Sequence, residues 1–471
     1  MTQTIDPAPP RPARARASGW FRAVWRWHFF AGFLVAPVLL VLATTGLIYL
    51  FRFELEPVMH PDLMKVEQPA DAVAQPYVQQ LAVVEKAYPG STAVSLAEPR
   101  EAGRATVVSI ETSGGEIRDV YVSPYGPEVL GSINPDTTLS GTAIRLHADL
   151  MAGRWGGYLI ELAACWAVVM AVTGYFLFAR GWRARRRARL AERRGARLRY
   201  RHGLVGAFAG VGLLALLVTG LPWTDFWGAK VQTFATERGT SLWSTDHGAI
   251  SNPTSTLDES LPHSHTQDLP WGQHKSEVPE SDPSAHDGGS VANVDTAVEV
   301  AARAGLRRPM TVALPADDDE GGVYSVIGYA FDAPSDERTV HVDRYGGQVV
   351  STYGFDDYPG LAKVVAQGIG LHEGRSLGLW SFWGAALMCA AVIFMCVTGP
   401  LMWWRRRPRG AGRMGAPRGR MPVRVTPLLA VVLVALGVFL PLFGLSLLVV
   451  LLLDQLVLRR VPALARWFDA A

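Results

Sequence analysis

The segment Leu371-His372-Glu373-Gly374-Arg375-Ser376-Leu377-Gly378-Leu379-Trp380 leads into a long apolar stretch, and its pattern occurs twice in the chain. His372 is followed by glycine after six residues, by tryptophan after eight and by Thr398-Gly399 after twenty-six. His147 has the same companions at the same offsets, ending in Thr173-Gly174. Spacing that repeats over this length predicts an internal duplication.

A second pair of histidines repeats with a different spacing. His28 precedes Thr45-Gly46 by 17 and 18 residues, and His202 precedes Thr219-Gly220 by the same offsets. Each half of the chain is therefore predicted to run helix, soluble insert, helix, with one histidine close to an end of each helix.

The composition is that of a membrane protein with polar segments. Of the 471 residues 49% are hydrophobic, and the three cysteines all lie in apolar runs, which excludes a disulfide framework or a CxxC metal site. Eleven arginines fall in residues 180–201 and eight in 405–424. Arginine runs that flank membrane spans mark the cytoplasmic side, so we expect no nucleic-acid partner.

The predicted fold is a mainly α membrane protein, with a duplicated bundle of four core helices, a C-terminal hairpin and two small extracytoplasmic α+β inserts. A span needs about 20 apolar residues, and the positive-inside rule places both termini in the cytoplasm. Pro441 and Gly444 offer a break in the last apolar stretch, which makes six spans. The predicted segments are a disordered tail (1–19), the first span (20–51), insert 1 (52–146), the second span (147–179), a basic loop (180–201), the third span (202–223), insert 2 (224–371), the fourth span (372–404), a basic loop (405–425), the hairpin (426–458) and a cytoplasmic tail (459–471).

Both inserts show the same order of predicted elements. A helix that ends at Tyr88-Pro89-Gly90 precedes strands at 105–110 and 119–122, and insert 2 repeats this order within residues 293–352. The polar loop 247–286 of insert 2 contains His247, His263, His265, His274 and His286. Such a loop can collect a metal ion, but the irregular spacing and the Ser, Pro and Asp content favour a solvated linker.

The four helix histidines are the candidate ligands. His28 and His202 begin outward-going helices, whereas His147 and His372 precede inward-going ones, so the histidines divide into a cytoplasmic and an outer level. Imidazoles that face each other across a helical bundle can hold a haem iron, and zinc would lack further ligands there. Gly46, Gly174, Gly220 and Gly399 arrive at the two levels and either leave room for a flat macrocycle or let the helices pack closely.

These features resemble the PepSY-associated transmembrane family, which includes iron-regulated membrane proteins and ferric-siderophore reductases. The resemblance covers nearly all of residues 20–458 and includes the Leu-Pro-Leu-Phe-Gly-Leu-Ser run at 440–446. It implies PepSY-like inserts and b-type haem, two in number, bound by His28, His147, His202 and His372. It also implies that electrons pass from the inner side to an oxidised substrate outside, typically a ferric chelate.

The expected function is that of a multi-pass di-haem oxidoreductase in the inner or plasma membrane, in contact with the lipid bilayer, which reduces ferric iron, as in a siderophore. The one GxGxxG string, at residues 410–415, lies in the basic loop and follows no predicted strand, so it is not read as a nucleotide fingerprint, and a quinol or a separate reductase must supply electrons. The alternatives are a pair of membrane-anchored PepSY modules that bind or regulate a peptidase or another outer-face partner, and a transporter of iron chelates. Glu161, inside the second span, could handle protons or pair with Arg154 or Arg375.

Overall fold

The computed structural model describes residues 19–193, 195–238, 240, 255–261, 264, 269–286, 292–330, 332–406, 414 and 426–468. The chain divides into two compact units: unit 1 comprises residues 1–36, 165–210 and 397–471, and unit 2 comprises 37–164 and 211–396. The boundaries between the units fall inside four long helices, α1 (Gly19–Leu50), α6 (Gly153–Leu190), α7 (Ala196–Gly220) and α11 (Leu379–Arg406).

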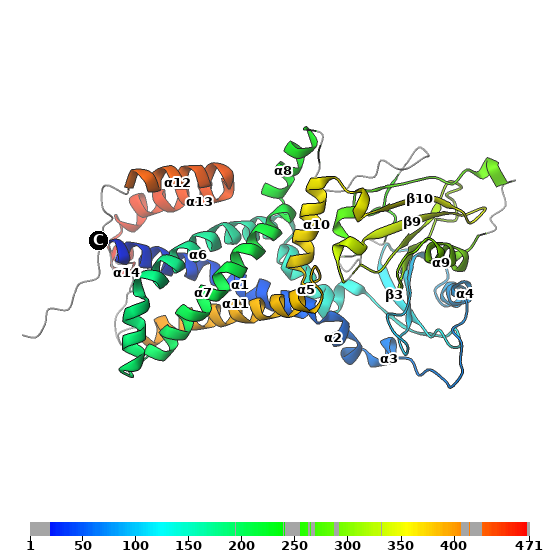
Figure 1. The fold of residues 1–471 in the computed structure, drawn as a ribbon, viewed down its shortest axis with the longest axis horizontal. Coiled ribbons are helices and arrows are strands. Elements are labelled where there is room, and N and C mark those ends of the chain that lie inside the picture. The colour runs from blue at the N-terminus through cyan, green and yellow to red at the C-terminus, as the bar shows by residue number, and fades with distance from the viewer. Residues whose placement is uncertain are drawn as a thin grey trace, which may run out of the picture. The chain divides into compact units, whose positions relative to one another are not determined.

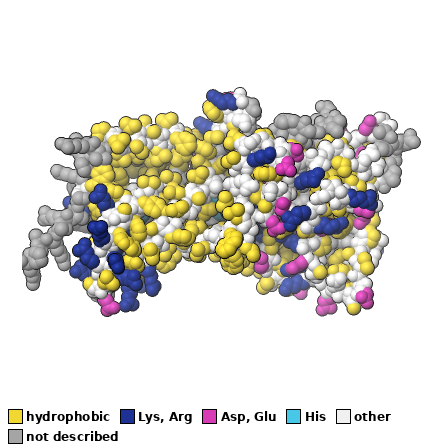
Figure 2. Space-filling view, viewed as in Figure 1, with side chains coloured by type: hydrophobic (Ala, Val, Ile, Leu, Met, Phe, Trp, Pro, Cys, Tyr) yellow, Lys and Arg dark blue, Asp and Glu magenta, His cyan; other side chains and the backbone are white. Residues whose placement is uncertain are grey.

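The long helices have the composition of membrane spans. Five helices among the described residues are long and apolar enough to cross a bilayer: α1, α6, α7 with the turn that follows it, α11 and the segment Pro441–Leu458. Arginines occupy the last turns of α6 and α11. In unit 1, Figure 2 shows hydrophobic side chains over the helices and Lys and Arg gathered where α6 ends and α7 begins. The prediction of a multi-pass membrane protein is confirmed.

The C-terminal apolar stretch forms two helices, α12 (Thr426–Phe439) and α13 (Pro441–Leu453), with the break immediately before Pro441. Gly437 and Gly444 lie in contact, and a Cβ atom on Gly444 would stand 2.7 Å from the Gly437 carbonyl oxygen. A span needs about 20 residues. Because α12 has only 14, the six-span topology stays a prediction.

The strands join one eight-stranded antiparallel sheet in unit 2, in the order β10-β9-β8-β7-β1-β2-β3-β4. Residues Ser95–Ala97 of β1 pair with Thr311–Ala313 of β7, which joins the strands before residue 140 to those after residue 310. Strands β1 and β7 were not among the predicted elements, so the shared sheet was not expected. The strands are β1 (Thr92–Ala97), β2 (Thr106–Glu111), β3 (Ile117–Val122), β4 (Val129–Ile133), β7 (Thr311–Ala313), β8 (Val323–Ile327), β9 (Arg338–Asp343) and β10 (Val349–Gly354). A separate two-stranded sheet pairs β5 (Ser255–Thr256) with β6 (Glu277–Val278).

The two faces of the large sheet differ. Helices α4 (Tyr77–Ala87) and α9 (Val294–Arg303) pack on one face, where alternate residues of β2 and β3, among them Val108 and Val120, are fully buried (Figure 1). Side chains alternate between the faces of a strand. The residues between them, such as Ser109 and Asp119, therefore face the other side of the sheet, where they line a cavity.

Short helices lead into two of the long ones. His147 lies on α5 (Leu139–Asp149) and His372 is the last residue of α10 (Gly360–His372). Helices α6 and α11 begin six and seven residues after these histidines, so each histidine precedes the long helix that follows it in the chain. Left-handed residues intervene in both places, Leu150 and Gly153 in one link and Gly374 and Gly378 in the other. Unit 2 also contains α2 (Arg52–Met59), α3 (Pro61–Met64) and α8 (Trp227–Thr236), and unit 1 contains α14 (Pro462–Trp467).

Candidate functional site: four histidine and Thr-Gly pairs

Each of the four predicted histidines meets the side chain of a threonine on another helix. In unit 2, Nδ1 of His147 lies 3.0 Å from Oγ1 of Thr45, and Nδ1 of His372 lies 3.1 Å from Oγ1 of Thr219. In unit 1 the same two atoms are 3.3 Å apart for His28 and Thr173 and 2.8 Å apart for His202 and Thr398. The Thr-Gly pairs found by spacing thus hold the histidines.

The direction of these hydrogen bonds follows from a second bond that the threonines make. Thr45, Thr173 and Thr219 each donate their hydroxyl proton to a backbone carbonyl four residues earlier, at 2.6–2.9 Å. A hydroxyl whose proton is engaged can only accept from the imidazole, so Nδ1 carries the ring proton. For His28 the carbonyl of Met170, 2.9 Å from Nδ1, requires the same tautomer. The Nε2 lone pair is then left available to a metal ion.

The glycine beside each threonine makes room for the histidine ring. A Cβ atom added to Gly174 or Gly220 would lie 3.1 Å from Cε1 of His28 or His372, and one on Gly46 would lie 3.4 Å from Cε1 of His147. The corresponding distance for Gly399 is 3.8 Å, to Cε1 of His202. At three of the four positions a side chain would therefore press against the ring.

The two histidines predicted for the outer level face each other in unit 2. The ring centroids of His147 and His372 are 6.2 Å apart and the ring planes are nearly perpendicular, at 86°. A metal–imidazole bond is about 2 Å long, so a metal ion between two Nε2 atoms would separate the centroids by about 6 Å. The spacing therefore fits a shared iron.

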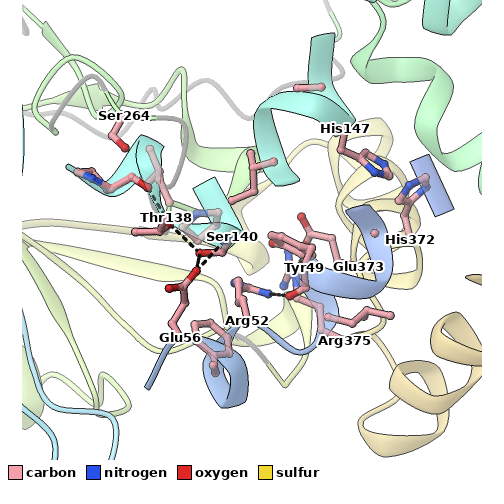
Figure 3. Close-up of a pocket in the computed structure, with 18 of the residues that line it drawn as sticks. Tyr49, Arg52, Glu56, Thr138, Ser140, His147, Ser264, His372, Glu373 and Arg375 are labelled. Carbon is pink, nitrogen blue, oxygen red and sulfur yellow. Dashed lines mark hydrogen bonds and ion pairs between the residues drawn. The ribbon is translucent and has the colours of Figure 1, made fainter. Parts of the chain in front are cut away.

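Both outer histidines line a cavity of about 1530 Å³ that lies within unit 2. Its apolar part is formed by the helices that bear the threonines, with Leu42, Leu216 and Gly46 among its walls. Its other part is polar and contains Glu56, Ser109 and residues of the sheet face opposite α4 and α9. Figure 3 shows the two rings side by side at one end and Glu56 with Ser140 at the other.

A buried ionic network follows His372 in the chain. The Arg375 guanidinium donates to Glu373 and to Glu337, both at 2.7 Å, and Tyr358 donates to Glu337 at 2.9 Å. Burial raises the pKa of Glu337, although Arg375 acts against this. Burial also acts to lower the pKa of Arg375, but its two carboxylate partners raise it overall. No sequence pattern pointed to this network, since its members are separated by up to 38 residues.

Among the described residues, Glu161 bonds to backbone N–H groups and not to an arginine. Its Oε2 atom accepts from the backbone N–H groups of Phe226 and Trp227, at 3.2 and 3.1 Å, where α8 begins, and its side chain is fully buried. The pair with Arg154 or Arg375, one of the two roles considered for Glu161, is not among the contacts of the described residues; the first residues of a helix instead offer N–H donors that attract a carboxylate.

Of the histidine-rich loop, only His274 has a described side chain. It lines the cavity of unit 2, and its Nε2 atom lies 3.4 Å from the Leu269 carbonyl oxygen. Burial lowers its pKa, with Asp258 acting in the opposite direction. His247, His263 and His265 lie outside the described residues, as does the side chain of His286. The described residues contain no group of three or more His, Cys, Asp or Glu side chains that could hold a metal ion.

The five long apolar helices among the described residues are those of a multi-pass membrane protein. The four histidines that contact threonines are its candidate metal ligands. Residues 25–406 match the model of the PepSY-associated TM region, which covers most of the chain. The chain therefore belongs to the PepSY-associated transmembrane family, as its motifs predicted. A search of the curated proteins found no match.

Proposed function

We propose that this protein is a di-haem transmembrane oxidoreductase that passes electrons outward and reduces an extracytoplasmic acceptor, ferric iron in a chelate such as a siderophore. The observation that carries the proposal is the repeated arrangement of four imidazoles, each fixed at Nδ1 by a threonine. In this proposal His147 and His372 hold one haem b, and His28 and His202 hold the other.

The surroundings of the outer pair favour a porphyrin over a small metal site. Two imidazoles suffice for a haem, whereas a structural zinc site takes four protein ligands. Apolar side chains line the cavity around the rings, and the glycines keep the helices free of side chains there. The chain has no CxxCH sequence, so the haem would be held without a covalent bond, as in b-type proteins.

A bound haem supplies a carrier for single electrons, and the protein controls how that carrier is held. Thr45 and Thr219 fix the tautomer and the orientation of the two outer rings. Apolar walls such as Leu42 and Leu216 exclude water around the rings. The polar part of the cavity, from Ser109 to Glu56, is where we place the chelate.

The direction of electron flow rests on the topology inferred from charge. The arginine-rich segments 180–201 and 405–424 place those loops, and with them both termini, in the cytoplasm of an inner or plasma membrane. The sheet region then faces outward. Because the GxGxxG string at residues 410–415 follows no predicted strand, we assign the chain no nucleotide site of its own, and a quinol or a separate reductase delivers electrons to the His28 and His202 level.

The duplication is part of this proposal. Each half contributes one histidine to each level, and each half contributes four strands to the common sheet. In a chain with such a repeat, each proposed ligand pair takes one histidine from each half, so the two pairs arise from one repeated sequence pattern.

The test is an absorption spectrum of the full chain purified in detergent. We expect dithionite to produce the sharp bands of b-type haem, with about two haems per chain. His28→Ala, His147→Ala, His202→Ala and His372→Ala should each lose roughly half of the haem. His274→Ala is the matched control, since His274 lines the cavity but meets no Thr-Gly pair. A folded wild-type protein without such bands would refute the proposal.

A further inference from the structure

Two buried carboxylates, Glu56 and Glu337, lie close to the helices that carry the outer histidines. Both are in unit 2, and their side chains are 10% and 0% exposed. A buried carboxylate is costly unless it is hydrogen-bonded or paired. Each of them bonds to a ligand-bearing helix or to the link that follows it. Both oxygens of Glu337 are hydrogen-bonded, whereas Glu56 bonds through Oε1, and its Oε2 atom is buried without a hydrogen bond among the described residues.

Glu56 holds the beginning of α5, the helix of His147. Its Oε1 atom accepts from the backbone N–H of Ser140 at 2.7 Å and from the Ser140 hydroxyl at 2.6 Å. A carboxylate at this position is favoured because the first N–H groups of a helix have no partner within it. Glu56 belongs to α2, which follows α1 directly, and α1 supplies Thr45 to His147. The same continuous stretch thus holds α5 near both ends, at Ser140 and at His147, and Figure 3 shows the Glu56–Ser140 bonds.

Glu337 holds the end of α10, the helix of His372. It stands immediately before β9 and pairs with Arg375, three residues after His372. Arg375 also donates to the Ala330 carbonyl at 2.9 Å. A Cβ atom on Gly370 would lie 2.5 Å from Cγ of Pro334, so α10 packs directly against the turn that precedes Glu337.

The chemistry of the Arg375 pair suits a positioning role better than a stabilising one. Removing two charges from water offsets most of their attraction, so a buried ion pair adds little stability compared with apolar residues of the same size. A guanidinium has a planar fork with fixed directions, and here it bonds Glu337, Glu373 and a backbone carbonyl at the same time. Such a contact fixes an angle as well as a distance.

We propose that Glu56 and the Glu337–Arg375 pair are positioning groups that set the separation of His147 and His372. This inference rests on the proposed haem function and assigns the sheet region a role in it. The sheet region holds α10 through Glu337, while the extension of α1 holds α5 through Glu56. The 6.2 Å separation of the ring centroids then depends on both of these contacts within unit 2 as well as on the helices that carry the histidines.

Binding of carbon monoxide to the dithionite-reduced full chain tests this proposal. An iron with two imidazole ligands has no free position, so carbon monoxide reports a ring that has moved away. We expect Glu337→Gln and Glu56→Gln each to raise the carbon monoxide-bound fraction about tenfold, the lower end of what loss of an outer-shell partner does to metal affinity. Glu299→Gln is the control, because Glu299 forms an exposed ion pair with Arg303 on α9.

A second readout does not need the haem. In protein prepared without haem, amide hydrogen exchange near residue 372 should be faster in Glu337→Gln than in wild type, and exchange near residue 140 should be faster in Glu56→Gln. Gel filtration identifies any variant that fails to fold, and Arg375→Lys then tests the same pair with the charge retained. Folded variants whose carbon monoxide binding equals that of wild type overturn the positioning role alone. A wild-type protein without haem overturns the proposed function and this inference together.

Discussion

Replacement of Thr45 by valine tests the proposed haem site most directly. Thr45 is 4% exposed, and its hydroxyl both donates to the Val41 carbonyl at 2.8 Å and lies 3.0 Å from Nδ1 of His147. Valine has nearly the same shape and removes only the oxygen. The substitution therefore leaves the packing of α1 in place and leaves the buried Nδ1–H group of His147 without this acceptor.

The size of the effect follows from the loss of that one hydrogen bond. A buried donor that loses its acceptor costs about 1–3 kcal/mol. Part of this cost falls on the orientation of the ring that would ligate the iron, because the tautomer is no longer fixed. The outer haem should be retained about fivefold to 150-fold less tightly, since each 1.36 kcal/mol corresponds to a factor of ten.

The assay adds increasing amounts of a competing haem-binding protein and measures, from the absorption spectrum of the reduced sample, how much haem stays on the chain. Thr44→Val is the matched control, because Thr44 is exposed and makes the same intrahelical bond, to the Leu40 carbonyl at 2.7 Å, without meeting a histidine. Equal haem retention in Thr45→Val and Thr44→Val would refute the reasoning that the threonines hold the ligand rings.

Three further predictions concern other parts of the chain. Gly174→Ala should lower haem content, because its Cβ would lie 3.1 Å from a histidine ring, whereas Gly399→Ala, at 3.8 Å, should retain it; equal pyridine haemochrome values would contradict this. Burial lowers the pKa of His341 from its ordinary 6.5 to about 4, so the unfolded chain binds a proton that the folded chain does not. Stability should fall by up to about 3 kcal/mol as the pH drops from 6.5 to 4, and thermal unfolding of His341→Gln should lack this slope. Gly444→Ala should separate α12 from α13 and lower the unfolding temperature without a change in the haem spectrum, because the added Cβ would lie 2.7 Å from a carbonyl oxygen.

Much of the site could be predicted from spacing alone. Equal offsets from histidine to Thr-Gly in the two halves identified all twelve residues that the structure brings together in four groups, each of one histidine, one threonine and one glycine. The helix histidines were separable from the others because they repeat, whereas those of the loop 247–286 do not. The spacing could not show that the threonine as well as the glycine contacts the ring. That contact depends on how two helices are aligned along their axes, which the sequence of one helix does not determine.

The contacts that position the site were not predictable in this way. Strand β7 was missed because its three residues, Thr311–Ala313, are too few to show an alternating pattern. Strand β1 has six residues but does not alternate, since the neighbours Ser95 and Leu96 are both buried. The partner of Glu161 was missed because a search for opposite charges overlooks backbone N–H groups. The Glu337–Arg375 pair depends on tertiary packing between α10 and the sheet, which a local pattern does not encode.

The pairing of β1 with β7 has a consequence for synthesis in the cell. Ala97 leaves the ribosome 214 residues before Thr311, its partner in the sheet. At about 5–20 residues per second this interval is about 10–40 s, during which the first half must be inserted while one edge of its sheet stays open. An open strand edge attracts other chains. Nascent protein stalled in that interval should therefore be the species most prone to aggregate and most dependent on chaperones.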